Sequence, residues 1–442
     1  MFLKHLELKN FRNYEDINLD LSCGLILFLG NNGTGKTNLL ESIFYLSNGK
    51  SHRLATQNDL INHGSDYCVI RGIIEAGGED KLIEIQLNND GGLKIKLNKV
   101  FVKNKSDFTS SLATVIFSPD DLRIIKSSPF YRRNFMDDIL EKTDKNFLSL
   151  RLKYQKILNQ RNSLLKSISG FKVSSSNSTM EVWDEKLIET GKLIIKKRLD
   201  LLKLIKTGFV KYMNYFFEKR DADIRYIFSW DRFELNGNFS NDNNEKDPGI
   251  NNNQPIRQVD YKNEMGNYSI RNSAEKFQED AGRININNEN ESQYIPTLKN
   301  QNENPASYSV IDKAFQEKLS YYFKKDIAIK TTTIGPHRDD ISIFLEGSDI
   351  RSFGSQGQQR IATICLKLVE LDVLAENINE KPMLLLDDVL SELDFERKHL
   401  LLKLIGNNFQ TFITAANFDY LKDIDLKYCE KFLVKDNTII RY

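Results

Sequence analysis

The sequence predicts an α/β fold of the P-loop ATPase type, with two catalytic halves separated by an inserted helical subdomain. The first supporting observation is a complete phosphate-binding loop at residues 30–37, between an apolar strand-like run and a helical pattern. The second is a later apolar run, residues 383–386, that ends in the acidic pair Asp387 and Asp388. The third is the long segment between these motifs, in which apolar residues recur at helical spacing.

The phosphate-binding loop reads GNNGTGKT. Its glycines allow the backbone N–H groups to approach a phosphate, while the following helix points its N-terminus at the anion. In such loops the Lys reaches the outer phosphates and the final hydroxyl ligates Mg²⁺. We therefore expect ATP and Mg²⁺ as cofactors, with Thr37 as a metal ligand and the nucleotide held by Gly30, Asn31, Asn32, Gly33, Thr34, Gly35, Lys36 and Thr37.

The chain has 442 residues, which is too many for one hydrophobic core. Changes in composition divide it into four predicted parts. Residues 1–130 form the N-terminal part of the ATPase head and residues 131–235 a helical arm subdomain. Residues 236–304, of which 18 are Asn, are predicted to be a disordered insertion because they offer few apolar side chains to bury. Residues 305–442 form the C-terminal part of the head.

Within these parts the periodicity predicts individual elements. Strands are expected at 69–74, 82–87, 93–97, 115–117, 327–329, 341–345, 383–386 and 411–414, with a hairpin at 432–440. An amphipathic helix is expected from the apolar stripe between residues 188 and 216, and another helix over residues 361–375.

Composition limits the cellular setting. The formal net charge of +1 gives no global argument for nucleic acid, so any such surface must be local. The four Cys residues are far apart in sequence, which favours a reduced environment over disulfides or a zinc site. Charges occupy the N-terminal residues and no apolar run approaches the ~20 residues that a membrane span needs. We therefore expect a cytoplasmic protein with no membrane partner.

The acidic pair follows its apolar run as the end of a Walker B strand does. Asp387 is expected to hold Mg²⁺, and Asp388 is expected to be the catalytic residue that orients or deprotonates the attacking water. An acidic pair after an apolar run is more often the start of a loop, but the upstream phosphate loop favours the functional interpretation.

Residues 353–360, FGSQGQQR, open a helix upstream of the acidic pair. Ser and Gly at a helix N-terminus present a hydroxyl and free N–H groups to an anion. By itself the pattern favours a plain helix N-cap, whereas its position before the Walker B run favours the signature loop of ABC-type ATPases. That loop contacts a nucleotide held by another subunit, so we expect nucleotide contacts from Ser355, Gln356, Gly357 and Gln358.

The distance between Lys36 and Ser355 predicts that the two halves of an ABC-type head are split by an inserted domain, as in the SMC and Rad50 group. More specifically, the chain resembles the RecF family of bacterial recombination mediators. Beyond the motifs already described, the matching runs are LKNFRNY (8–14), KSHR (50–53), FSPDDL (117–122), RRNFMD (132–137), YQKILNQRN (154–162), GPHRDD (335–340) and LLLDDVLSELD (384–394).

The resemblance implies an ATP-dependent homodimer that binds gapped or junction DNA. It also implies partnership with RecR and RecO in loading RecA, in gap repair and in SOS induction, with slow ATP hydrolysis that controls release. The sequence gives weaker support for two further nucleotide contacts. Arg12 either reaches the nucleotide or pairs with Glu15 or Asp16, and Thr414 stands where transporter ATPases carry a γ-phosphate-sensing His.

Other polar positions remain open. His337 and Arg338 follow a Gly-Pro turn, where a structural role is as well supported as phosphate sensing. Four basic clusters are candidate phosphate contacts, although most charge runs are solvated faces. They are Lys50/His52/Arg53, Lys94/Lys96/Lys99/Lys103/Lys105, Arg123/Lys126/Arg132/Arg133 and Lys196/Lys197/Arg198.

Two alternative functions compete with this interpretation. An SMC-like or overcoming-lysogenisation-type ATPase would require long coils or an appended nuclease domain. The ATPase subunit of a transporter would require a signature loop close behind the phosphate loop, which the spacing in this chain disfavours.

Overall fold

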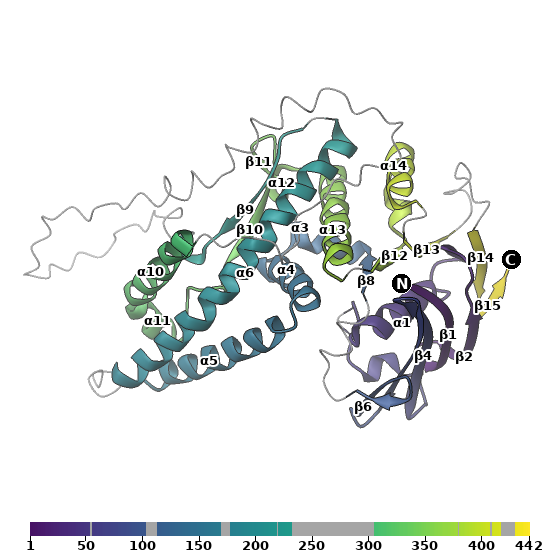
Figure 1. The fold of residues 1–442 in the computed structure, drawn as a ribbon, viewed down its shortest axis with the longest axis horizontal. Coiled ribbons are helices and arrows are strands. Elements are labelled where there is room, and N and C mark those ends of the chain that lie inside the picture. The colour runs from purple at the N-terminus through teal and green to yellow at the C-terminus, as the bar shows by residue number, and fades with distance from the viewer. Residues whose placement is uncertain are drawn as a thin grey trace, which may run out of the picture. The chain divides into compact units, whose positions relative to one another are not determined.

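The computed structural model describes residues 1–53, 55–102, 113–168, 177–218, 220–231, 305–378, 380–406, 409–416 and 429–442 (Figure 1). The predicted Asn-rich insertion, 236–304, lies outside the described residues, as do Lys103 and Lys105.

A six-stranded sheet forms the centre of the head. Four neighbouring strands run parallel, as the apolar runs at 383–386 and 411–414 predict for strands that are buried on both faces. A fifth parallel strand, which forms the C-terminal hairpin with the sixth strand, completes one side. The strand order is β15 (Thr438–Arg441), β14 (Cys429–Lys435), β3 (Leu25–Leu29), β13 (Thr411–Ala415), β12 (Met383–Asp387) and β8 (Thr114–Phe117).

A second six-stranded sheet is antiparallel throughout. It contains the strands predicted at 69–74, 82–87 and 93–97. Its apolar side chains alternate along the strands, so that one face is buried. The order is β2 (Tyr14–Asp20), β1 (Phe2–Phe11), β4 (Tyr67–Ala76), β5 (Glu79–Asn88), β6 (Leu93–Leu97) and β7 (Val100–Phe101).

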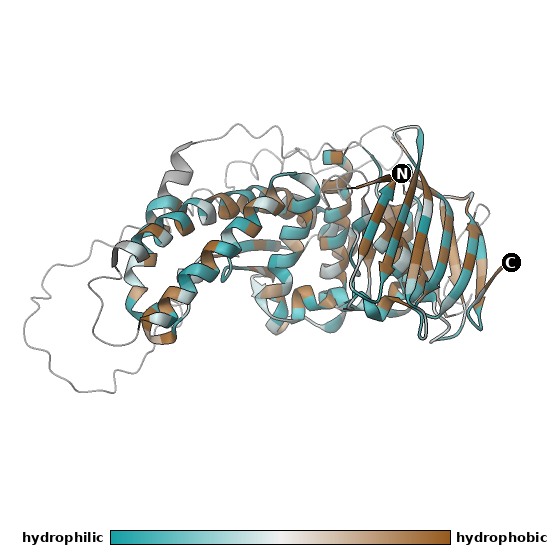
Figure 2. Cartoon of the chain, turned by 90° about the horizontal axis from the view of Figure 1, so that it is seen from below, coloured by the Kyte–Doolittle hydropathy of each residue, from teal (hydrophilic) through white to brown (hydrophobic). Residues whose placement is uncertain are grey.

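Alternation along the parallel strands divides the hydrophobic core in two. Ile26 and Phe28 of β3 point into one cluster, which contains the antiparallel sheet and helix α1 (Lys36–Asn48). Leu27 and Leu29 of the same strand point into the other cluster. That second cluster contains apolar residues of α4 (Pro129–Thr143), α6 (Asn177–Phe217) and α13 (Gln356–Ile378). Figure 2 shows the corresponding hydrophobic stripes along the strands and helices.

The predicted apolar stripe between 188 and 216 lies on α6, the longest helix among the described residues. It packs against α5 (Phe147–Ser167) and α10 (Pro305–Tyr321). Helix α6 leads to a strand that the sequence analysis did not predict, β9 (Ala222–Ile227). This strand pairs with β10 (Asp340–Leu345), which also pairs with β11 (Ser348–Asp349).

One predicted strand is wrong. Residues 327–329 end helix α11 (Phe323–Ile329) instead of forming a strand. The Asp326 side chain accepts hydrogen bonds from the N–H and hydroxyl of Thr333, and Lys330 ends the helix in the left-handed conformation. Ile329 is 52% exposed, so the Ile-Ala-Ile pattern does not reflect a buried sheet face.

Short elements connect the longer ones. They are η1 (Asn58–Leu60), η2 (Pro119–Leu122), α3 (Arg123–Lys126), α12 (Ile350–Phe353), η3 (Val389–Glu392) and α14 (Phe395–Ile405). At η2, Ser118 and Asp121 form a capping box. None of the helices in the described part of the chain has the length and apolar character needed to cross a membrane.

The turn at residues 335–340 is a buried polar junction. His337 contacts the Tyr154 hydroxyl of α5 through Nδ1 at 2.7 Å, and burial lowers its pKa to about 3. The Asp339 carboxylate accepts hydrogen bonds from the N–H of Ser229 and the hydroxyl of Tyr226. These contacts favour the structural interpretation of His337, because a neutral imidazole enclosed in this way is a poor ligand for phosphate.

Two arginines of the predicted basic clusters belong to the same junction. Arg132 pairs with Asp340 at 2.7 Å and is 3% exposed. Arg198 pairs with Asp137 at 2.8 Å and donates to the carbonyl of Pro336. Their interpretation as DNA-phosphate contacts is therefore wrong, because both guanidiniums are buried in ion pairs within the protein.

Arg161 connects three elements of the arm. Its guanidinium pairs with Asp184 of α6 and with Asp326 of α11, and it donates to the hydroxyl of Thr332. Arg161 and Asp326 are both 0% exposed. Removing the cation would leave a buried carboxylate without its counter-charge, which is more costly than the loss of a surface ion pair.

We predict that Arg161→Ala lowers the free energy of unfolding by about 3–5 kcal/mol, measured by urea denaturation. The matched control is Arg151→Ala on the same helix, whose side chain is 37% exposed and pairs with Glu141. That control should cost about 1 kcal/mol or less. Equal losses of unfolding free energy in the two variants would contradict the conclusion that the buried ion pairs of Arg161 hold the arm together.

Candidate functional site

The phosphate-binding loop joins β3 to α1 and is shaped by close backbone contacts. A Cβ atom at Gly30 would lie 2.3 Å from the carbonyl oxygen of Val434, so only glycine fits there. Gly35 has φ +106°, and a Cβ atom would lie 2.5 Å from the Asn13 amide and 2.8 Å from the Tyr14 hydroxyl. The turn between β1 and β2 therefore packs directly against the loop.

Lys36 begins α1, and its side chain folds back over the loop. Its Nζ donates to the carbonyl oxygens of Gly30 at 2.6 Å and Asn31 at 2.8 Å. Burial lowers its pKa, and the charges of Asp388 and Asp387 oppose that shift. The ammonium group thus lies at the mouth of the loop, where a phosphate can replace the two carbonyl oxygens as its partner.

Thr37 meets the Walker B strand although the two are far apart in sequence. Its hydroxyl donates to Asp387 Oδ1 at 3.0 Å. The same carboxylate oxygen accepts from the hydroxyl of Thr414 at 2.9 Å. Strands β3, β13 and β12 are parallel neighbours, so the carboxyl ends that carry these residues meet at one edge of the sheet.

The electrostatics of this edge suit a divalent cation. Burial raises the pKa of Asp387, while the hydrogen bonds from Thr414 and Thr37 oppose the shift. Asp388 is next to it and has a left-handed backbone, φ 54°, with its N–H donating to Thr414 Oγ1 at 2.9 Å. Hydroxyl and carboxylate oxygens are ligands that Mg²⁺ prefers, so Thr37 and Asp387 fit the ion.

The candidate signature loop caps α13. The N–H of Ser355 donates to Gln358 Oε1 at 2.7 Å, and the N–H of Gln358 donates to Ser355 Oγ at 3.2 Å. This reciprocal pair is a capping box, so the N-cap interpretation describes the local structure. The loop is nevertheless exposed at Ser355, Gln356 and Gly357, and the Ser355 hydroxyl hydrogen is not used by the cap.

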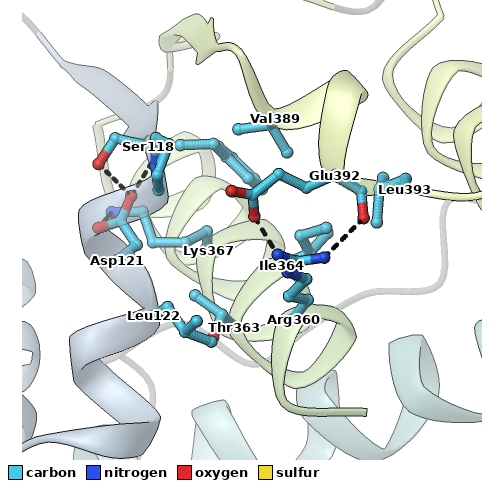
Figure 3. A pocket seen from close by; sticks show the side chains of 12 residues that line it. Ser118, Asp121, Leu122, Arg360, Thr363, Ile364, Lys367, Val389, Glu392 and Leu393 are labelled. Carbon is cyan, nitrogen blue, oxygen red and sulfur yellow. Dashed lines mark hydrogen bonds and ion pairs between the residues drawn. The ribbon is translucent and has the colours of Figure 1, made fainter. Parts of the chain in front are cut away.

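A small pocket lies between α13, η2 and η3 (Figure 3). On its rim, Arg360 Nε lies 3.2 Å from Glu392 Oε2, and Arg360 also donates to the Glu392 carbonyl at 3.3 Å. None of the twelve lining residues belongs to the phosphate loop. The ion pair therefore connects the signature helix to the segment after the Walker B strand, outside the nucleotide site itself.

Comparisons with known proteins agree with this arrangement. The profile of the RecF/RecN/SMC N-terminal domain matches residues 2–438. The chain is 34% identical to the DNA replication and repair protein RecF of Clostridium novyi over 440 residues, covering 99% of both chains. It is 35% identical to the RecF of Thermoanaerobacter pseudethanolicus over 422 residues, covering 96% of both. The chain belongs to the RecF family.

Solved structures give the same result for the fold. A structure titled as the recombination mediator protein RecF with ATPrS in the RecFOR pathway superposes with a TM-score of 0.75. The two sequences are 31% identical, and the alignment covers 100% of this chain and 98% of the RecF chain in that structure. The corresponding RecF structure titled with ATP has a TM-score of 0.73. The predicted ABC-type ATPase head is thus confirmed, and the transporter-subunit alternative is wrong.

In this RecF-family chain Arg12 does not pair with Glu15 or Asp16. Its Nε and Nη2 donate to the Glu41 carboxylate, each at 2.9 Å, and its Nη1 donates to the Asp59 carbonyl. Glu41 lies on α1 and is 0% exposed. Arg12 thereby connects the turn after β1 to the helix behind the phosphate loop, and its nucleotide contact stays a prediction.

Several residues that support the site are not apparent from the sequence. Asn13, which packs against Gly35, accepts from the Asn38 amide at 2.7 Å. The charge of Arg53 opposes the burial that raises the pKa of Asp387, and its guanidinium donates to Asn38 at 3.2 Å. The basic run at 50–53 gave a signal for Arg53, but only contact across the fold identifies Asp387 as a neighbour. Thr414 contacts Asp387 directly, so the structure gives it a positioning role at the Walker B carboxylate.

We predict that Mg²⁺-dependent ATP affinity falls as the pH decreases through the raised pKa of Asp387, because only the ionised carboxylate binds the metal. Titrations with a fluorescent ATP analogue from the ordinary pKa range of an Asp carboxyl up to about pH 8 would measure this. Asp387→Asn is the matched control, since it retains the titration of ATP itself but lacks the carboxylate. Identical pH profiles for the two proteins would contradict the metal assignment.

Proposed function

We propose that this protein is an ATP-dependent DNA-binding recombination mediator that acts in DNA replication and gap repair. The contact between Thr37 and Asp387, at 3.0 Å, is the observation that carries the proposal. It joins the phosphate loop to the Walker B strand in one nucleotide site. Curated relatives of the same length are named DNA replication and repair protein RecF, which supports the biological role.

ATP occupies the loop from Gly30 to Thr37, and Mg²⁺ is held by Thr37 and Asp387. The ion supplies charge neutralisation at the phosphates. Lys36 binds the outer phosphates in place of the loop carbonyls. Asp388 orients or deprotonates the attacking water, and Thr414 keeps the acidic pair in register through its two hydrogen bonds.

Two copies of the chain complete the site between them. Within one copy, Ser355 is exposed at the N-terminus of a 23-residue helix, where a hydroxyl and free N–H groups face outward. Among the described residues its hydrogen bonds go to Gln358 and Gln359 of the same helix, and none of them involves the phosphate loop. The signature loop of each copy therefore contacts the nucleotide that the other copy holds, which makes ATP the link between the subunits.

The ATP-bound dimer binds gapped or junction DNA and works with RecR and RecO to load RecA, supporting SOS induction. Hydrolysis is slow and controls release from DNA. The structurally similar proteins are described as RecF recombination mediators of the RecFOR pathway, which supports these partners.

We predict that Ser355→Arg retains ATP affinity but abolishes the ATP-induced dimer, because a bulky cation at this position blocks the surface that faces the other copy. Gel-filtration mass with ATP, with ADP and without nucleotide tests this directly. The control is Ser352→Arg, another exposed position three residues earlier that lies outside the capping box. A Ser355→Arg protein that dimerises with ATP like the wild type would contradict the shared site.

Lys36→Ala and Asp388→Asn should have opposite effects on DNA retention. Lys36→Ala loses ATP binding and with it tight DNA binding, because the outer phosphates lose their cation. Asp388→Asn retains ATP binding and holds DNA longer, because hydrolysis is impaired. Asn also tolerates the left-handed backbone at this position, so the variant adds little strain. Equal nucleotide affinities in the two variants would refute this division of roles.

A further inference from the structure

The outer face of α5 differs in charge from the rest of the chain. The protein as a whole has 62 Lys and Arg residues against 61 Asp and Glu. Helix α5 has 21 residues, of which five are Lys or Arg and none is Asp or Glu. The neighbouring helix α6 mixes both signs along its length. A helix without any carboxylate in a chain of balanced charge produces a local positive potential.

The two arginines of α5 are used within the protein, whereas its three lysines are not. Arg161 is buried between Asp184 and Asp326, and Arg151 pairs with Glu141. Lys153, Lys156 and Lys166 are exposed, and among the described residues no carboxylate pairs with them. Their positive charges therefore remain available to a partner.

These lysines lie on one continuous face. At 100° per residue, the exposed positions of α5 fall within about half of the helix circumference. Polar side chains capable of binding phosphate fill the spaces between the lysines. The face consists of Ser149, Leu152, Lys153, Gln155, Lys156, Asn159, Gln160, Ser163, Lys166 and Ser167. From Lys153 to Lys166 it extends about 20 Å, because a helix rises 1.5 Å per residue.

The opposite face holds α5 rigidly in the arm. Tyr154, Ile157, Leu158 and Leu165 are buried against the core cluster that contains α6. The side-chain Oδ1 of Asn162 accepts hydrogen bonds from the N–H and the hydroxyl of Thr332. Figure 1 shows α5 lying along α6. The basic face is thus presented on a fixed helix, which lowers the ordering cost of binding a long anion.

We propose that the outer face of α5 binds the phosphodiester backbone of DNA. The inference rests on the proposed DNA-binding function and names the surface that performs it. Lysines interspersed with amide and hydroxyl groups, without base-reading geometry, fit sequence-independent contact with phosphates.

The test compares the full-length protein with a triple variant, Lys153→Gln/Lys156→Gln/Lys166→Gln, in DNA binding with saturating ATP. Gln retains helix propensity, so folding and ATP affinity should be unchanged. We expect DNA affinity to fall about tenfold or more near 0.15 M salt. The slope of log affinity against log salt should become shallower by up to about 2.7, because each phosphate contact contributes about 0.9.

Two controls separate the possible outcomes. The triple Lys→Arg variant preserves charge and should bind DNA as the wild type does. Lys203→Gln/Lys381→Gln/Lys403→Gln removes three exposed positive charges outside the basic clusters and should change the affinity much less. If the wild type binds DNA and the α5 variant has the same DNA affinity and the same salt slope, the assignment of the α5 face as the DNA-binding surface is wrong, and the proposed function still stands. A wild type that shows no ATP-dependent DNA binding would overturn the proposed function as well.

Discussion

The contact between Thr37 and Asp387 is the constraint on which the rest of the head depends. The two residues are 350 positions apart, and their oxygens come within 3.0 Å because β3, β13 and β12 are parallel neighbours. Sheet hydrogen bonds set the register, and the alternating apolar side chains of β3 fix which face meets each half of the core. Any segment inserted between the two motifs must therefore return the chain to this sheet edge.

Buried polar contacts, as well as apolar packing, position the chain where it comes back from the arm to the head. In the turn at 335–340, His337 contacts α5, Asp339 contacts the segment after β9, and Asp340 pairs with Arg132 of α4. Each of these groups would be costly to bury alone, and each has its partner on a different element. The turn thus fixes the start of β10 relative to the arm, and the α12–α13 signature region follows directly from that strand.

Sequence alone predicted the parts of the site that are encoded locally. The phosphate loop requires glycines at fixed spacing, and the Walker B strand requires an apolar run before Asp387. Both patterns involve residues that are close together in the sequence, so they can be recognised without the structure. Partners across the fold were not predictable in this way. Arg12 pairs with Glu41 instead of Glu15 or Asp16, and residues 327–329 form the end of a helix because Asp326 is anchored by Thr333.

The most direct test of the account mixes two inactive variants. In dimers formed from Lys36→Ala and Ser355→Arg chains, one composite site has both defects and the other has an intact Lys36 facing an intact Ser355. ATP hydrolysis and DNA retention should therefore reappear when the two proteins are combined, although neither shows them alone. If each chain instead uses its own signature loop, every site stays defective and the mixture remains inactive. Persistent inactivity of the mixture would contradict a site shared between two copies.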